Sequence, residues 1–129
     1  MFATARQPAD VDRLRAEGLE SLPLDLRDST SIQAAVAMVL DRTGGGLDAL
    51  FNNGAYGQPG AVEDLSRESL REQFETNLFG TQELTNQVIP VMRRQGGGRI
   101  LYTSSVLGLV AFPYRGAYVA SKFALEGLA

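Results

Sequence analysis

The 129-residue sequence predicts an α/β fold in which a doubly wound parallel sheet forms one domain spanning residues 1–129. Short, nearly continuous apolar segments alternate with segments of helical periodicity, and such strands are typical of a parallel sheet covered on both faces. The pattern Arg-x-Gly-Gly-Gly also occurs twice, at 42–46 and 94–98, each time closing a helical segment and opening an apolar strand. One helix–strand unit is therefore used twice.

The first elements are short. Residues 1–5 are apolar and match the end of a buried strand. Asp10 is placed to cap a helix over 11–17, which Gly18 ends. A second strand over 19–26 follows.

The next helix is stronger and begins at Asp28. Its apolar residues follow the spacing of a stripe packed on a sheet: Ile32, Ala35, Val36, Val39 and Leu40. The triple glycine 44–46 ends this helix. A third strand over 47–51 then leads into the loop Asn52-Asn53-Gly54-Ala55.

Residues 66–94 form a long helical pattern that Asn77 and Gly80 interrupt. Its expected core face comprises Leu70, Phe74, Leu78, Leu84, Val88 and Met92. After the second triple glycine we expect a fourth strand over 99–103. A loop over 104–116 then leads into a last helix.

The composition excludes several mechanisms. The chain has neither cysteine nor histidine, which removes disulfides, thiolate nucleophiles, histidine triads and ordinary zinc sites, so we expect no metal site. A net charge of −3 provides no basic stripe for nucleic acid. No apolar run approaches the roughly 18 residues of a membrane span and no leader pattern opens the chain, so we expect a cytoplasmic protein.

The last helix carries Tyr118 and Lys122, the only lysine of the chain. Residues four apart on a helix share a face, and a nearby ammonium favours the ionised form of a phenol. The positive end of the helix dipole acts in the same direction. The pair therefore predicts a general acid/base, and the alternative is a surface tyrosine lying along a lysine stem.

Other polar candidates follow the predicted strands. Arg6, Asp25, Asn52-Asn53 and Ser104-Ser105 each stand where a strand ends. Ligands of open parallel sheets bind beyond the carboxyl ends of the strands. We therefore expect these side chains to share one edge.

This order of residues resembles the short-chain dehydrogenase/reductase family. The resemblance rests on Asn52-Asn53-Gly54 after a strand, Asn77 in a broken helix, Ser105 after the next strand, and Tyr118 with Lys122. It implies that Tyr118 is the acid/base and that Lys122 assists it and binds the nicotinamide ribose. It implies that Ser105 holds the substrate oxygen, and that Asn77 fixes the helix break and a water of the proton relay.

The resemblance also implies a cofactor side. Asp25 corresponds to an acidic residue that contacts adenine, although an aspartate closing a strand is also an ordinary turn former. Arg6 favours NADP over NAD, since an arginine there accommodates the 2′-phosphate, and its alternative is a solvated arginine. Asn53 and Gly54 belong to the loop beside the cofactor. Gly54-Ala55 exchanges the order usual in the family, which moves the position free to take a positive φ.

The implied fold is Rossmann-like and partial. The resemblance begins at the family's second strand and ends in the helix of Tyr118, so the first strand, its glycine-rich turn and the C-terminal strands are missing. The first strand normally lies between the pair 1–5 with 19–26 and the pair 47–51 with 99–103. We expect either a non-native closure or open strand edges, marginal stability, and weak dinucleotide binding.

The resemblance implies an NADP-dependent oxidoreductase that transfers a hydride between the nicotinamide and an alcohol or carbonyl substrate. Within the family the sequence most resembles bacterial aldehyde, ketone or retinol-type reductases. An apolar pocket wall is expected from Leu107, Leu109, Val110 and Phe112, and the alternative is that these four side chains simply pack. The alternatives are a catalytically inactive fragment that acts as a binding piece, and a module that forms a homodimer or homotetramer through the helices of Asn77 and Tyr118.

Overall fold

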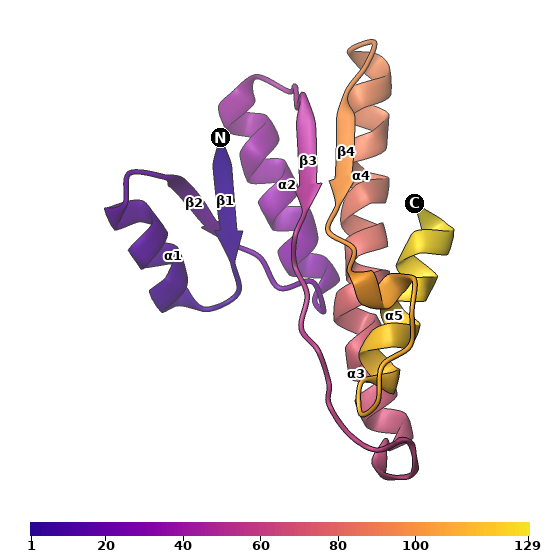
Figure 1. Ribbon diagram of the computed structural model, residues 1–129. Helices are drawn as coiled ribbons and strands as arrows, with labels where there is room; N and C mark the ends of the chain where they lie inside the picture. The colour runs from indigo at the N-terminus through magenta and orange to yellow at the C-terminus, as the bar shows by residue number, and fades with distance from the viewer.

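The computed structural model describes residues 1–129 and confirms the predicted alternation of strands and helices (Figure 1). The elements are β1 (Phe2–Ala5), α1 (Pro8–Ala16), β2 (Glu20–Pro23), α2 (Ser29–Thr43), β3 (Ala49–Asn52), α3 (Arg67–Phe74), α4 (Thr81–Arg94), β4 (Arg99–Tyr102) and α5 (Gly116–Leu128). A π-helical segment, Glu75–Gly80, joins α3 to α4. Single 3₁₀ turns occupy Val62–Asp64 and Val106–Gly108.

The strands form two separate parallel pairs. Phe2 lies opposite Glu20 in the β1–β2 pair, and Ala49 lies opposite Arg99 in the β3–β4 pair. Figure 1 shows the strands in the order β2, β1, β3, β4, and no ladder joins β1 to β3. The structure therefore has open strand edges and not a non-native closure. Each strand pairs on one side only, so the N–H and C=O groups on its other side have no partner strand.

Helical contacts hold the two pairs together. Helix α2 packs on α4, and Ser29 Oγ donates a hydrogen bond of 2.9 Å to Glu83 Oε2. At Gly80, a Cβ atom would collide with the backbone carbonyl of Leu26. The segment after β2 therefore approaches the helical half so closely that only glycine fits at position 80.

Helix α1 begins earlier than predicted. Pro8 occupies the first turn, where its missing N–H and fixed φ are tolerated, and Gln7 is the N-cap. The prediction that Asp10 caps this helix is wrong. Asp10 instead accepts a hydrogen bond of 3.1 Å from Arg13 on the helix surface. The neighbouring β2 is also shorter than the predicted 19–26, since its ladder ends at Pro23.

Helix α2 follows its prediction. Asp28 is the N-cap, and its carboxylate accepts a hydrogen bond of 2.9 Å from the Thr30 N–H. Gly44 ends the helix with φ at 69°, in the left-handed region. Ile32 and Ala35 of the predicted stripe are buried.

The long helical pattern breaks where the sequence predicts. Asn77 and Gly80 are both buried in the π-helical segment. Leu70, expected in the core, is 37% exposed, and Gln73 is fully buried on α3 instead. The one buried side chain of α3 is thus polar, because it meets the backbone of residues 56–58.

The apolar core is small. Of 129 residues, 21 are buried, and most of the apolar ones lie on α4 and α5: Leu84, Val88, Val91, Met92, Ala117, Val119 and Leu125. The helical half therefore carries more of the packing than the β1–β2 half does.

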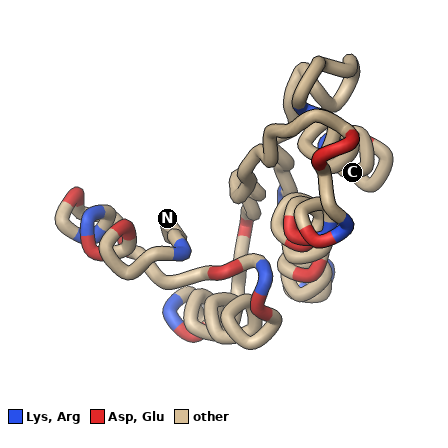
Figure 2. Tube along the Cα trace, turned by 90° about the horizontal axis from the view of Figure 1, so that it is seen from below, with Lys and Arg blue, Asp and Glu red and all other residues tan.

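Charged residues of both signs are interspersed along the helices (Figure 2). Among the helices, none combines the length and the apolar character that a membrane span requires.

Candidate active site

Tyr118 lies in the first turn of α5, which begins at Gly116. Tyr114, just before the helix, adopts a positive φ of 59°, a conformation that a non-glycine residue rarely takes. Lys122 follows one turn later, and its Nζ lies 5.7 Å from the centroid of the Tyr118 ring. The ammonium and the phenol therefore share a face, as their spacing predicts.

Lys122 is only 2% exposed. Its Nζ donates a hydrogen bond of 2.6 Å to the carbonyl of Thr103, immediately after β4. Burial lowers the pKa of Lys122, because the charged form loses solvation. The bond to Thr103 fixes the position of the Lys122 Nζ beside the Tyr118 ring.

Asn77 is tied to α5 through Ser121. The Asn77 Nδ2 donates a hydrogen bond of 3.0 Å to Ser121 Oγ, and this hydroxyl donates one of 2.8 Å to the Tyr118 carbonyl. Asn77 and Ser121 are both buried. The π-helical segment is thus joined to the first turn of α5 by buried hydrogen bonds.

Ser105 follows β4 and caps the turn Val106–Gly108. Its Oγ accepts a hydrogen bond of 3.1 Å from the Leu107 N–H, and this turn packs on α5. The neighbouring Ser104 hydroxyl is buried without a hydrogen-bond partner. Ser105 thus holds the backbone of Leu107, a residue that lines one hollow together with Tyr118.

The residues predicted for the cofactor side are more exposed. Arg6 is exposed just after β1 and forms none of the ion pairs of the chain. The carboxylate of Asp25 accepts a hydrogen bond of 2.9 Å from the Arg27 N–H and lies 3.6 Å from the Arg27 guanidinium. Asp25 also donates its own N–H to Ser31 Oγ. Asp25 thus has the turn-forming role that the sequence also allowed.

The loop after β3 connects to Lys122 through Thr103. The Thr103 hydroxyl donates a hydrogen bond of 2.7 Å to Asn53 Oδ1. Gly54 does not adopt a positive φ. A Cβ on Gly54 would instead lie 2.6 Å from a methyl group of Leu26. The loop at Gly54 therefore packs closely on the Leu26 side chain, which would have to turn aside for a larger residue.

A hollow of about 400 Å³ opens beside Tyr118. It is lined by Ala55, Tyr56, Gly57, Leu107, Arg115 and Tyr118. The pKa of Tyr56 is raised by burial and then by Glu72, with Arg27 acting in the opposite direction. Of the predicted apolar wall, only Leu107 lines the hollow.

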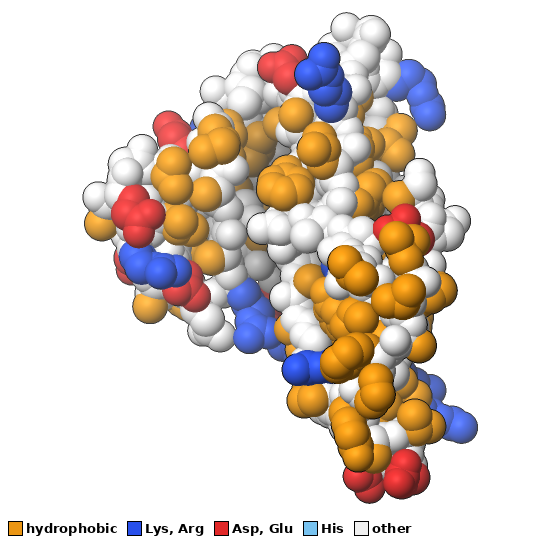
Figure 3. Space-filling view, viewed as in Figure 1, with side chains coloured by type: hydrophobic (Ala, Val, Ile, Leu, Met, Phe, Trp, Pro, Cys, Tyr) orange, Lys and Arg blue, Asp and Glu red, His pale blue; other side chains and the backbone are white.

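The rest of that predicted wall faces solvent. Leu109 is 70% exposed, Phe112 60% and Val110 51%. Figure 3 shows hydrophobic side chains gathered over the lower part of the molecule, where this loop and the surrounding helices lie. For these three side chains the apolar wall stays a prediction, and the alternative that they pack in the core is not met.

Comparison with known families decides the identity. The family model described as short chain dehydrogenase matches residues 2–129. This chain belongs to the short-chain dehydrogenase family. The predicted family and the partial Rossmann-like fold are confirmed.

Individual members of the family are similar to this chain. An uncharacterized oxidoreductase of Escherichia coli, YbbO, is 40% identical over 126 residues, covering 98% of this chain and 47% of the relative. Human 17-beta-hydroxysteroid dehydrogenase type 1 is 43% identical over 110 residues, covering 85% and 33%. A short-chain dehydrogenase from Streptomyces avermitilis superposes with a TM-score of 0.90 at 38% identity, covering 98% and 48%. The chain thus spans about half the length of these relatives or less.

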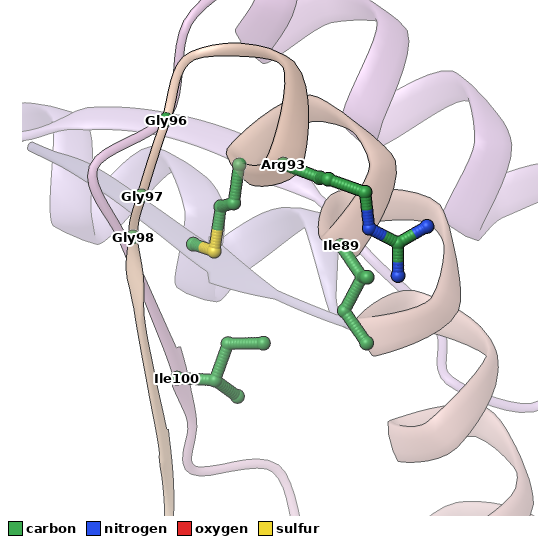
Figure 4. Close-up of a pocket in the computed structure, with 7 residues that line it drawn as sticks. Ile89, Arg93, Gly96, Gly97, Gly98 and Ile100 are labelled. Atoms are coloured by element: carbon green, nitrogen blue, oxygen red, sulfur yellow. The ribbon is translucent and has the colours of Figure 1, made fainter.

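A second hollow, of about 470 Å³, lies at the other end of this short-chain dehydrogenase chain. It is lined by Ile89, Met92, Arg93, Gly96, Gly97, Gly98 and Ile100. Figure 4 shows Ile89 and Ile100 between α4 and β4. Its lining contains no acid or base other than the Arg93 guanidinium, which stays protonated. We therefore place the candidate chemistry at Tyr118.

Sequence reasoning missed three residues of the polar network in this family member: Gln73, Thr103 and Ser121. Gln73 precedes Asn77 by four residues, and that spacing alone places both amides on one helix face. Ser121 lies three residues after Tyr118, and this spacing also places the two residues on one helix face. Thr103 acts partly through its backbone carbonyl, which no side-chain pattern reveals.

Proposed function

We propose that this chain carries the acid/base machinery of an NADP-dependent oxidoreductase that transfers a hydride between the nicotinamide and an alcohol or carbonyl. The observation that supports this most is the Lys122 ammonium 5.7 Å from the Tyr118 ring, beside a hollow that Tyr118 lines. The proposal concerns the whole protein's activity, since the chain spans about half of its relatives.

In this proposal Tyr118 donates a proton to the carbonyl oxygen during reduction, or removes one from the alcohol during oxidation. A nearby ammonium stabilises the phenolate that forms when the proton leaves. Lys122 is held for this role by its hydrogen bond to Thr103. Because its surroundings exclude water, the interaction between the two charges is stronger than it would be at the surface.

Ser105 and Asn77 support the same step. The Ser105 hydroxyl retains a donor hydrogen, because its Oγ acts as an acceptor toward Leu107. That hydrogen is available to the substrate oxygen on which negative charge develops. Asn77 holds the helix break and, through Ser121, the backbone of Tyr118.

The cofactor fits the residues present in two places. Lys122 and Asn53 meet at Thr103 and would hold the nicotinamide ribose end, with Gly54 beside them. Arg6 has an exposed guanidinium without an internal carboxylate partner, which suits a 2′-phosphate, and Asp25 would face the adenine. When bound, NADP supplies or accepts the hydride.

For the substrate we propose an aldehyde, a ketone or a retinol-like alcohol. The hollow presents the rings of Tyr56 and Tyr118 with the side chain of Leu107, a surface suited to an apolar body that carries one oxygen. The human relative at 43% identity is by name a hydroxysteroid dehydrogenase, which agrees with a bulky apolar alcohol.

The test is oxidation of NADPH, followed by absorbance, with a panel of aldehydes and ketones at millimolar cofactor. We expect Tyr118→Phe to lower kcat about 10²- to 10⁴-fold, the usual contribution of a general acid/base. Tyr114→Phe is the matched control, since Tyr114 is 70% exposed and its change also removes one hydroxyl. Equal activity of the Tyr118 variant and the control would refute the assignment.

A second role, self-association, is favoured by exposed aromatic side chains. Phe79 on the π-helical segment is 54% exposed and Phe123 on α5 is 46% exposed. Exposed side chains of this size on the two helical segments suit contact with a second copy as a homodimer or homotetramer. Sedimentation velocity of the chain and of Phe79→Ser/Phe123→Ser tests it, and a monomer at all concentrations would exclude it.

A further inference from the structure

Gln73 has a fully buried side-chain amide that the proposed reaction does not yet use. Its Oε1 accepts a hydrogen bond of 2.8 Å from the Gln58 N–H, and its Nε2 donates one of 2.8 Å to the Tyr56 carbonyl. One partner is a donor and the other an acceptor, so the amide has only one orientation that satisfies both. Gln73 thus closes a clamp on the backbone of residues 56–58.

Asn77, one helical turn after Gln73, bonds to the same loop. Its Oδ1 accepts a hydrogen bond of 3.1 Å from the Tyr56 N–H, and its Nδ2 donates one of 2.9 Å to the Tyr56 carbonyl. The Asn77 amide is shared, because Nδ2 also donates to Ser121. Gln73 therefore contributes the bonds that Asn77 has no remaining group to make.

The clamped loop lies directly on the ring of Tyr118. A Cβ atom on Gly57 would lie 3.3 Å from Tyr118 Cδ2 and 3.5 Å from Cγ. Tyr56 and Gly57 also line the hollow that Tyr118 faces. The path of the loop thus sets both the wall of the hollow and the space that the phenol ring can occupy.

The other end of the loop is fixed independently. The Gly60 N–H donates a hydrogen bond of 3.0 Å to the Tyr114 carbonyl, and Gly60 forms an isolated parallel bridge with Arg115. Loss of the Gln73 bonds therefore leaves the Gln58 N–H without a partner, while Asn77 still holds Tyr56 and Gly60 stays bonded at the base of α5.

We propose that Gln73 is a positioning residue that acts on Tyr118 through the loop 56–58. It holds this loop against the ring, so that the phenol keeps one orientation toward the hollow. The kinetic part of the proposal rests on the proposed oxidoreductase function, and the structural part does not.

The first test measures amide hydrogen exchange of Tyr56 and Gln58 by NMR in the whole chain. Gln73→Met keeps the length and volume of the side chain and removes both hydrogen bonds. We expect exchange at Gln58 to become about tenfold faster or more, because its N–H loses its only partner. Gln82→Met is the matched control, since Gln82 bonds only to Asn86 on the surface. Unchanged protection at Gln58 in Gln73→Met would overturn the clamp.

The second test measures acetylation of Tyr118 by N-acetylimidazole, followed by peptide mass spectrometry. We expect Gln73→Met to change the rate at Tyr118 several-fold and to leave the exposed Tyr114 unchanged. Val88→Ala, in the core of α4, is the control for a general loss of stability. An equal change in Val88→Ala, or no change in Gln73→Met, would overturn the positioning of Tyr118.

The third test separates this inference from the proposed function. Where the chain oxidises NADPH, we expect Gln73→Met to lower kcat about tenfold with little change in KM for NADPH, and unchanged kcat would overturn the positioning role. Absence of turnover in the unmodified chain would count against the proposed function alone. Exchange and acetylation would then decide the role of Gln73.

Discussion

The proposed catalytic side and the proposed cofactor side of this chain are built differently. Asn77, Ser121 and Lys122 are buried, and each has hydrogen-bond partners on another segment of the chain. Arg6 and Asn53 are exposed, and Asn53 has a single side-chain hydrogen bond. The first group lies in a packed helical half, whereas the second lies at the ends of strands with open edges.

The two sides differ because one depends on contacts between neighbouring helical segments and the other on pairing between strands. The first turn of α5 and the π-helical segment meet through side chains that the helices themselves place. Strands β1 and β3 each have a partner strand on one side only, so one edge of each is left without a ladder. The contacts that join Asn77, Ser121 and Lys122 to other segments are therefore formed within this chain, whereas the strand edges beside Arg6 and Asn53 stay open.

The largest effect is expected where the two sides touch. Gly80→Ala would place a Cβ on the backbone carbonyl of Leu26, which cannot move without shifting the end of β2. We expect a loss of more than about 3 kcal/mol in the free energy of unfolding, at the upper end of overpacking costs. Urea unfolding followed by circular dichroism measures it.

Gly97→Ala is the control for that change, because nothing lies within 4 Å of a Cβ there and its φ is not positive. We expect it to change stability by less than about 0.5 kcal/mol. Similar losses in both variants would mean that the contact at Leu26 does not join the two halves.

The two asparagines compare the sides directly. Asn77→Leu removes the bonds to Tyr56 and Ser121 and leaves the Tyr56 N–H without its partner, so we expect a loss of about 2–3 kcal/mol. Asn53→Leu removes one exposed bond to Thr103, and we expect less than about 1 kcal/mol. Equal losses in thermal unfolding would contradict the difference between the two sides.

Sequence patterns predicted most of the helices because their boundaries depend on local residues. Helix α2, with its Asp28 cap and its Gly44 end, is determined by residues within the helix. The break at Asn77 and the shared face of Tyr118 and Lys122 are also local. Spacing therefore predicts them, and the structure places them as predicted.

The misses involve contacts between distant segments. Gln73 is buried because a loop fifteen residues earlier presents backbone groups to it, and helical periodicity assigned that inner face to Leu70 instead. Gly54 serves a contact with Leu26, which lies in a different part of the sequence. Neither partner can be identified from periodicity, because the pairing depends on how the halves approach one another.

Lys122 offers a test of burial on the catalytic side. Burial lowers its pKa below the ordinary value of 10.5, so between the two values the unfolded chain binds a proton that the folded chain does not. Stability therefore rises as pH increases through this window towards 10.5, by about 1.4 kcal/mol for each unit of depression.

The measurement compares the free energy of unfolding of the chain with that of Lys122→Met from pH 7 to 10.5. We expect the free energy of unfolding of the unmodified chain to increase relative to that of the variant as the pH rises. The comparison cancels the raised pKa of Tyr56, which is common to both proteins. Parallel curves would show that Lys122 is solvated, like the residues of the cofactor side.

The smallest effect on folding is expected at Arg6, where the cofactor side can be probed without disturbing the rest. Arg6→Ala removes an exposed guanidinium that forms none of the chain's ion pairs, so we expect a change in stability below about 0.5 kcal/mol. The affinity for NADPH relative to NADH, measured by calorimetry, should fall about tenfold, because a charge-assisted bond to the 2′-phosphate is lost.

Arg94→Ala, which changes an exposed arginine at the far end of α4, is the control and should leave this affinity ratio unchanged. A ratio unaffected by the Arg6 change would make Arg6 a solvated surface arginine, and the cofactor preference of the protein would then have to come from residues outside this edge.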